Sequence, residues 1–198
     1  QEIVEFMKQP GIYEDGTKEV GHKQTHISHV FLTNDYVFKI KKPVNMGFLD
    51  FDTLEKRKFY CEEEIRLNKR LCSEIYYGVV PVTKEGDKLE LNGNGEVVEY
   101  AVKMKRMPEE AIMKDLLQQD KVEYRQIKQI AKTLADFYNN APRSEEINEY
   151  GKREVVKQAT DQNFEQTEKY VGDIFDEIKY EYIKEATNRF FENKKKLF

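Results

Sequence analysis

The sequence predicts an α+β protein, in which a strand-rich front half with one long helix precedes a back half made of helices alone. Short β-branched and aromatic runs, bounded by Gly, Pro, Asn and Asp, recur up to Met107, and none is evident after Pro108. From there on, apolar residues recur at helical spacing. A hydrophobic content of 39%, with 12 Tyr and 12 Phe, is sufficient to build a core, so wholesale disorder is not expected.

The first elements in chain order are a short helix, two strands and a long helix. Residues 3–9 are typical of a short helix, which Pro10-Gly11 ends. Two β-rich runs follow, KQTHISHVFLT and YVFKIKK, and they are joined at Asn34-Asp35, two residue types that tolerate the positive φ of a tight hairpin. Residues 51–72 then predict a helix, with Asp52 as its N-cap and Glu55 as the partner in a capping box.

Three further strands complete the front half, so that a sheet of five strands is expected. They are GVVPVT, KLEL and EVVEYAVKMKRM, with turns at Glu85-Gly86-Asp87 and at NGNG. The back half predicts helices at about 109–119, 123–140, 153–170 and 173–195. The second of these has the strongest amphipathic pattern. The two halves divide at Met107-Pro108, into residues 1–107 and 108–198.

Cysteine use and charge limit the class of protein. Cys61 and Cys72 fall in one predicted helix, where eleven residues of about 1.5 Å each separate them by roughly 16 Å. A disulfide tolerates a Cα separation of only about 7 Å, so both are interpreted as reduced thiols of a cytoplasmic protein. The formal net charge of −4 argues against nucleic acid or an anionic membrane as the main partner. No apolar run reaches the roughly 20 residues of a membrane span.

A lysine in an apolar strand and a triple glutamate in the next helix form the most informative pair. Strand alternation places Val37, Lys39 and Lys41 on one face of YVFKIKK. At 100° per residue, Glu64 projects inside the apolar arc of the helix, whereas the two preceding glutamates project outside it. A buried lysine and a buried glutamate are costly unless they pair. The alternative is an edge-strand lysine and a helix-flank glutamate, both in solvent.

The region that holds this pair resembles a known kinase family. THISHVFLTNDYVFKIKKPVNMGFLDFDTLEKRKFYCEEEIRLNKRL, followed by YYGVVPV and VEYAVKMKRMP, is similar to aminoglycoside phosphotransferase-like kinases, and more narrowly to a bacterial branch in which that domain is fused to a P-loop ATP-binding domain. The resemblance covers residues 1 to about 165 and is dense from His22 to Pro108. It implies a kinase-like antiparallel small lobe over 1–107, a hinge, and the first part of a helical large lobe over 108–198.

The resemblance also implies roles for particular residues. Lys39 takes the phosphate-contacting position and Glu64 is its helix partner. Val37 packs on the base, and Met104 leads into a hinge whose backbone, from Lys105 to Met107, meets the adenine edges. The family places a phosphate loop near VGHKQTHISHV, where Gly21 is the only glycine and the hydroxyl of Thr25 is the candidate substitute. ATP and Mg²⁺ are the cofactors expected for the full-length protein.

The catalytic part of the family pattern is missing from this chain. Kinases of this kind need a histidine–glycine–aspartate segment, a nearby asparagine and a second, metal-binding aspartate. The histidines here are His22, His26 and His29, all in the front half, and Gly172-Asp173 fits a helix junction better. Two explanations stay open: a kinase-like protein truncated before its active site, which both abrupt ends favour, or a complete module that has lost catalysis and serves a fused or partner ATPase.

Other patterns predict little specific chemistry. On a single strand His22 and His26 would share a face and His29 would point away, so a metal site is not expected. The runs KIKK, KMKR and NKKK are interrupted by acids and favour solvated faces over an RNA-binding surface. The segment FDEIKYEYIKEATNRFF carries apolar residues on more than one face, which makes a homo-oligomer through this helix an open alternative.

Overall fold

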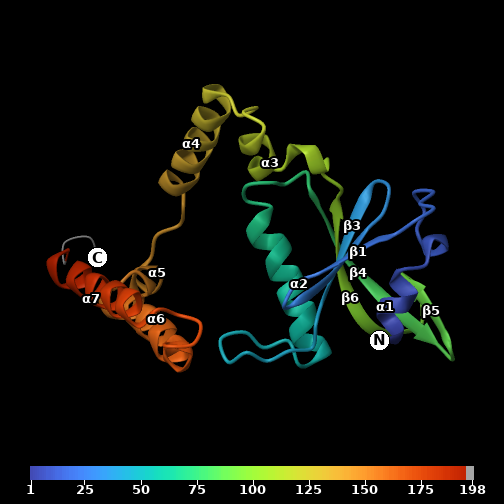
Figure 1. Ribbon diagram of the computed structural model, residues 1–198. Helices are drawn as coiled ribbons and strands as arrows, with labels where there is room; N and C mark the ends of the chain where they lie inside the picture. The colour runs from blue at the N-terminus through green and yellow to red at the C-terminus, as the bar shows by residue number, and fades with distance from the viewer. Residues whose placement is uncertain (195–198) are drawn as a thin grey trace. The chain divides into compact units, whose positions relative to one another are not determined.

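The computed structural model describes residues 1–194 and shows an α+β chain, as the sequence predicts (Figure 1). The strands are β1 (Gly21–Gln24), β2 (Ser28–Leu32), β3 (Tyr36–Lys41), β4 (Tyr76–Glu85), β5 (Lys88–Leu91) and β6 (Glu96–Lys105). The helices are α1 (Glu2–Met7), α2 (Leu54–Asn68), α3 (Met113–Gln118), α4 (Tyr124–Asn139), α5 (Glu145–Tyr150), α6 (Arg153–Thr167) and α7 (Glu177–Asn193). Short 3₁₀ helices are η1 (Pro10–Ile12), η2 (Glu109–Ala111) and η3 (Glu168–Tyr170).

The chain divides into two compact units, Gln1–Ile130 and Ala131–Phe198, with the division inside α4. All six strands and α2 belong to the first unit. The boundary predicted between residues 107 and 108 therefore falls within the first unit, just after β6, and the division into two lobes there remains a prediction.

The six strands form one antiparallel sheet in the order β1-β2-β3-β6-β4-β5. Helix α2 packs against β6 and β4 on one face, and α1 lies on the other face (Figure 1). Alternation along β3 then separates its side chains. Phe38 and Ile40 enter the core with α1, whereas Lys39 and Lys41 face α2.

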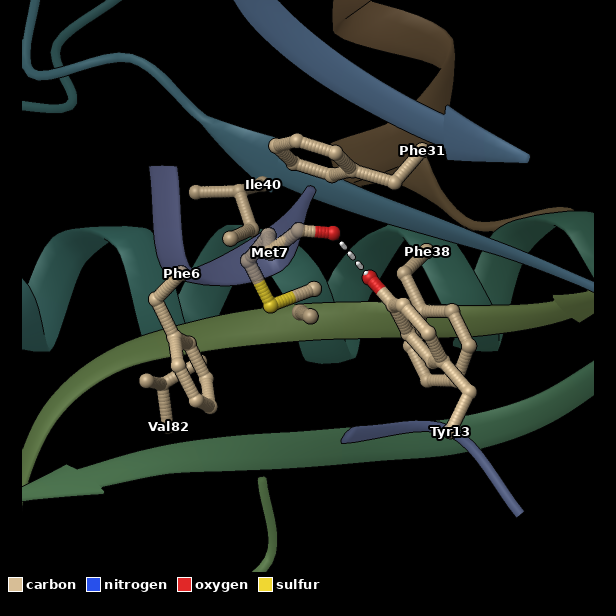
Figure 2. Packing of buried hydrophobic residues seen from close by; sticks show 8 residues of the cluster. Phe6, Met7, Tyr13, Phe31, Phe38, Ile40 and Val82 are labelled. Atoms are coloured by element: carbon tan, nitrogen blue, oxygen red, sulfur yellow. Dashed lines mark hydrogen bonds between the residues drawn. The ribbon is translucent and has the colours of Figure 1, made fainter. Parts of the chain in front are cut away.

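The core on the α1 side is built from aromatic and aliphatic side chains of α1, β2, β3 and β4 (Figure 2). Met7 and Phe31 are fully buried in it. The hydroxyl of Tyr13 donates to the carbonyl of Met7 at 2.5 Å, and the Tyr13 ring lies 5.0 Å from that of Phe38, centroid to centroid. Burial raises the pKa of Tyr13, so this hydroxyl keeps its proton and remains a donor.

The first predicted β run is in fact two strands, which is why the sheet has six strands instead of five. The chain reverses at residues 25–27, where the amide of Thr25 donates to the carbonyl of Ser28 at 2.9 Å. The reversal brings His22 and His29 together, with Nε2 and Nδ1 3.2 Å apart and the rings stacked. The prediction that His29 points away from His22 is therefore wrong, since it assumed one continuous strand.

Burial lowers the pKa of both imidazoles, and nearby lysines add to the effect. His22 and His29 are therefore neutral near pH 7 and can share one proton across the 3.2 Å contact.

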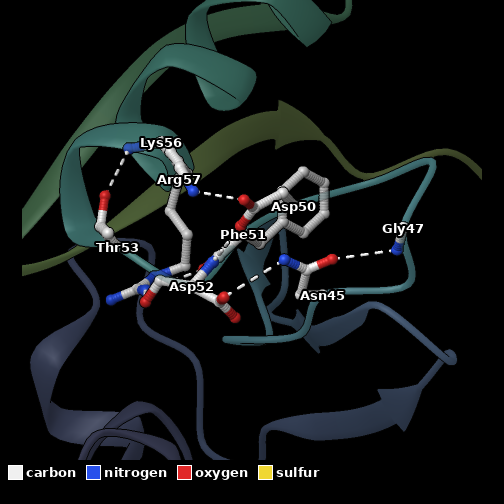
Figure 3. Close-up of polar contacts among 8 residues, drawn as sticks. All are labelled: Asn45, Gly47, Asp50, Phe51, Asp52, Thr53, Lys56 and Arg57. Atoms are coloured by element: carbon white, nitrogen blue, oxygen red, sulfur yellow. Dashed lines mark hydrogen bonds and ion pairs between the residues drawn. The ribbon is translucent and has the colours of Figure 1, made fainter.

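Helix α2 begins later and ends earlier than the sequence predicts. Its N-cap is Thr53, whose hydroxyl accepts from the amide of Lys56 at 3.3 Å, so the assignment of Asp52 as N-cap is wrong by one residue. Asp52 instead accepts from the amide group of Asn45 at 3.4 Å (Figure 3). Cys72 lies beyond the end of α2, and both cysteines are free thiols.

The back half contains helices and one isolated β-bridge in the part that the structure describes, with boundaries different from those expected. The segment 109–119 splits into η2 and α3, and α5 was not predicted. The last helix begins at Glu177, because the Asp176 side chain accepts from the amide of Lys179 at 2.9 Å and so caps it. Gly172 has a positive φ of 85° in the turn before α7, which agrees with a junction at Gly172-Asp173.

In α7 the large apolar and aromatic side chains divide between two environments. Tyr180 and Phe191 are buried, whereas Ile178, Tyr182 and Ile183 are exposed. Self-association through α7 remains a prediction, and residues 195–198, which include the second half of the NKKK run, lie outside the described residues.

One carboxylate ties the loop before β1 to the β2–β3 turn. Asp15 accepts from the hydroxyl of Thr17 at 2.5 Å, the hydroxyl of Thr33 at 2.6 Å and the amide of Asp35 at 3.0 Å. Partial burial acts to raise the pKa of Asp15, but these hydrogen bonds outweigh it and lower the pKa from 3.8 to about 2. A depressed carboxyl pKa stabilises the folded state above pH 3.8 and loses this effect as the pH falls toward 2.

We therefore expect Asp15→Asn to lower the free energy of unfolding by about 1–2 kcal/mol at pH 7, because an amide has one acceptor where the carboxylate has two. Urea denaturation at pH 7 and between pH 4 and pH 2 measures this difference. The gap between the variant and the parent should shrink as the pH falls through this window. Asp87→Asn, in the exposed β4–β5 turn, is the control and should change stability little. A constant gap at all pH values would contradict the assignment.

Candidate functional site

A lysine of β3 and a glutamate of α2 meet between the sheet and the helix. The Nζ of Lys39 lies 2.9 Å from Oε1 of Glu64, and their side chains are 27% and 14% exposed. This confirms the pairing that strand and helix periodicity predict. The role of the pair is a separate question.

A second ammonium completes the arrangement. Lys41, on the same face of β3, places its Nζ 2.8 Å from Oε2 of Glu64 and is only 6% exposed. Its ammonium also lies 5.0 Å from the centroid of the Phe51 ring. One carboxylate therefore serves two cations, and the cluster carries a formal net charge of +1. The sequence placed Lys39 and Lys41 on one face, but it gave no indication that both reach the same carboxylate.

The electrostatics keep Glu64 ionised at neutral pH. Burial alone would raise its pKa, but hydrogen bonds and charge attraction from Lys41 and then Lys39 lower the pKa below the usual value. The neighbouring glutamates point elsewhere: Glu63 pairs with Arg66 at 2.6 Å on the helix surface, and Glu62 lies 3.9 Å from an exposed lysine. Helical periodicity thus chose the correct glutamate among three.

A buried ion pair, in which one N–H is shared between two carboxylate oxygens, fixes α2 on the sheet two turns before Glu64. The Nε of Arg57 lies 2.9 Å from both carboxylate oxygens of Glu99 in β6. The Nη1 of Arg57 donates to the carbonyls of Phe51 and Asp52, each at 3.0 Å (Figure 3). Because positions seven apart share a helix face, this pair sets the position from which Glu64 reaches β3.

Strand alternation does not predict this pair, for a local reason. Glu99 lies two residues before Ala101, whose side chain faces the core on the α1 side of the sheet. Simple alternation would therefore point Glu99 to the same side, away from α2. The β4–β6 register, however, shifts between Val82, opposite Glu99, and Thr83, opposite Val97. This bulge redirects the Glu99 side chain toward Arg57. The only sequence signal was an arginine and a glutamate within apolar surroundings.

The predicted base-contacting residues lie on the same face of the sheet as Lys39. Val37 and Met104 are directly opposite each other in the β3–β6 ladder, next to the Lys39–Val102 pair. The structure thus brings Val37, Lys39, Met104 and Glu64 to one side of the sheet.

The hinge residues follow at the end of β6. The amide of Lys105 donates to the carbonyl of Ile75 and the amide of Arg106 to that of Asp35, both at 2.8 Å. Met107 comes next and is 50% exposed. Of the three amides from Lys105 to Met107, two are thus already used inside the fold.

The β1–β2 turn lies at the Lys41 end of β3. Ser28 is directly opposite Lys41, and the carbonyl of Thr25 accepts from Nζ of Lys42 at 2.8 Å. The hydroxyl of Thr25 is directed at the Ser28 carbonyl, 3.4 Å away. No contact links Thr25 to Lys39 within residues 1–194, so its predicted role stays a prediction.

Ser28 was not singled out by the sequence, yet its hydroxyl is unusual. It is fully buried, on the same face as Lys41, and has no hydrogen-bond partner among the described residues. Buried polar atoms are normally satisfied, so this oxygen is a candidate to bind a water molecule or a ligand atom beside the Lys41–Glu64 pair.

Residues 1–194 contain neither a cluster of metal ligands nor a helix that could span a membrane. Within this range no three His, Cys, Asp or Glu side chains cluster as metal ligands do. Nor does any helix in it combine the length and the apolar character that crossing a membrane requires.

The fold and site therefore define an α+β chain that holds a strand lysine against a helix glutamate. In sequence, it is similar to uncharacterized proteins of Mycobacterium bovis and of two strains of Mycobacterium tuberculosis, with 26% identity over 176 residues. The match covers 89% of this chain and 34% of each relative, so the chain spans about a third of the length of the curated relatives it matches. No protein-family model matches the chain, and no solved structure matches it.

Proposed function

We propose that this chain is the nucleotide-binding portion of an aminoglycoside phosphotransferase-like small-molecule kinase of the cytoplasm. The observation that carries the proposal is the ion pair between Lys39 and Glu64, a half-buried lysine held by a carboxylate from the adjoining helix. A lysine restrained in this way presents its remaining N–H donors in a fixed direction, which suits the oxygens of a nucleotide phosphate.

The charge of the cluster supports an anionic ligand. Glu64 neutralises one of the two ammoniums, and Lys39 is the more exposed of the two lysines. In our proposal Lys39 contacts the phosphates, while Lys41, which is almost fully buried, holds Glu64 in place. The Ser28 hydroxyl, which has no hydrogen-bond partner among the described residues, supplies a further polar atom on the same face.

The base would lie along the same face of the sheet. Val37 and Met104 offer apolar contact for it, and the backbone at Lys105 and Met107 would meet its polar edge. In this family, Mg²⁺ binding and catalysis depend on a segment that contains a histidine, a glycine and an aspartate. This chain lacks that segment, since no histidine follows residue 29. The acceptor substrate is therefore left open, because a fold does not fix a substrate.

The second candidate is a module that keeps the small-lobe architecture and serves a fused or partner ATPase as a non-catalytic interaction surface. The two candidates differ in whether the chain itself binds a nucleotide.

Isothermal titration calorimetry with Mg-ATP on the chain decides between them. We expect saturable binding with a dissociation constant of about 0.1–1 mM, because only one side of the site is provided by the sheet and α2. Adenosine should bind more weakly than ATP if Lys39 contacts phosphate. No heat at millimolar Mg-ATP would contradict the proposal and favour the interaction module.

A further inference from the structure

A cavity lies on the face of the sheet opposite Lys39 and Glu64. It measures about 120 Å³ and opens to the surface between η1 and the strands. Its apolar wall comes from Tyr36 and Phe38 of β3, Val80 of β4, Leu91 of β5, and Ile12 and Tyr13. The Tyr13 and Phe38 rings, which lie side by side in Figure 2, form part of this wall.

The polar part of the lining comes from Glu14, Asn92 and one cation, Lys103. Lys103 of β6 is directly opposite Phe38, and its Nζ lies 3.9 Å from the centroid of the Tyr36 ring. Throughout the described residues, no carboxylate forms an ion pair with Lys103. The ring faces supply only part of the coordination that an ammonium with three donors can make, so an acceptor is lacking beside it.

A glycine lies opposite this lysine in the sheet. Gly78 pairs with Lys103 across the β4–β6 ladder, at a point where the register shifts. A Cβ added at Gly78 would meet no atom within 4 Å. A strand glycine weakens a sheet and commonly marks a place where a ligand approaches the backbone closely.

The size and chemistry of the cavity select its ligand. An engineered cavity of about 150 Å³ holds one benzene molecule, so this smaller cavity, which opens to the surface, admits at most a single six-membered ring. The aromatic and aliphatic wall suits such a ring, and Lys103 suits one anionic substituent. The exposed carboxylate of Glu14 at the rim disfavours a second negative charge. We propose that this cavity binds a small monocyclic aromatic carboxylate, whose carboxylate pairs with Lys103.

This site is distinct from the nucleotide site proposed above. Lys103 and Phe38 face the α1 side of the sheet, whereas Lys39 and Glu64 face α2. Failure of ATP binding would therefore leave the second site standing, and the reverse also holds.

Titration of the ¹⁵N-labelled chain with benzoate, followed by amide NMR shifts, tests the proposal. We expect saturable shifts at Tyr36, Val80 and Lys103, with a dissociation constant of about 1 mM for a ligand of this size. Benzyl alcohol, which has the same ring but no charge, should bind at least tenfold more weakly. Equal affinity for the two, or shifts that do not saturate or that lie elsewhere, would overturn the proposal.

Two variants separate charge from space. Lys103→Met should weaken benzoate at least tenfold and leave benzyl alcohol within about twofold, since it removes only the ammonium. Val80→Phe enlarges a side chain of the cavity wall and should abolish binding of both ligands.

Lys58→Met is the matched control, because the Nζ of Lys58 lies 5.6 Å from the Tyr100 ring on the α2 side, away from the cavity. It should bind benzoate like the parent. Thermal melts verify that each variant is folded. A folded Lys103→Met that binds benzoate as tightly as the parent would also overturn the proposal.

Discussion

Replacing Arg57 with methionine is expected to lower the free energy of unfolding by about 3–5 kcal/mol, the typical cost of removing one partner of a buried ion pair. The substitution leaves the Glu99 carboxylate, 7% exposed, without the N–H that its two oxygens share. It also leaves the carbonyls of Phe51 and Asp52 without the donor that Nη1 supplies. Urea denaturation at pH 7 measures the loss.

A double variant tests whether the loss of stability comes from leaving the buried Glu99 carboxylate without a partner. Arg57→Met with Glu99→Leu removes both charges from the interface, so much of the lost stability should return. Arg66→Met is the control, since Arg66 and Glu63 form a similar pair on the solvated surface of α2, and it should change stability little. An Arg57→Met variant as stable as the parent would show that α2 is held mainly by apolar contacts.

Replacing Lys39 with methionine is expected to weaken Mg-ATP binding by about 10–100-fold, the usual contribution of a charge-assisted hydrogen bond to phosphate. The fold should survive, because Lys39 is partly exposed and Glu64 keeps Lys41 as its partner. Calorimetry gives the affinity and thermal melting gives the stability. A Lys39→Met variant that binds ATP like the parent would contradict the phosphate role.

Glu64→Ala should weaken ATP binding to a similar extent but, unlike Lys39→Met, it should also destabilise the chain. It leaves Lys41, 6% exposed, as an unpaired buried ammonium. Lys58→Met, on the outer flank of α2, is the matched control and should change neither quantity. An unchanged affinity in Glu64→Ala would mean that the Lys39–Glu64 pair plays no part in ATP binding.

Much of the site could be predicted because it depends on short-range periodicity. A period of two fixed the face of Lys39, and a period of 3.6 chose Glu64 over Glu62 and Glu63, since both rules act within a single element. The β2–β3 hairpin and the β4–β5 turn were found for a similar reason. Gly86 has a positive φ in the β4–β5 turn and Asn92 has one in the β5–β6 turn, whereas the β2–β3 turn at Asn34-Asp35 forms without the positive φ expected there.

The wrong and missed predictions concern places where that periodicity is interrupted. The turn at residues 25–27 contains neither Gly nor Pro, so the run from Lys23 to Thr33 looked like one strand. The bulge at Glu99 likewise leaves no mark in the residue types, and so Arg57–Glu99 was missed. The bounds of α2 shifted because Thr53, and not Asp52, has the backbone geometry of an N-cap.

The sequence by itself determined the α+β class, the faces of β3 and α2, and the inward direction of Glu64, because these follow from local geometry. Only the tertiary structure decided that Glu64 serves Lys41 as well as Lys39, and that Arg57 reaches Glu99. It alone also showed that Lys103 lines a cavity together with residues of β3, β4 and β5. These contacts join residues far apart in the chain, whose distances depend on strand register and on how a helix sits on a sheet, and neither is encoded in a local period.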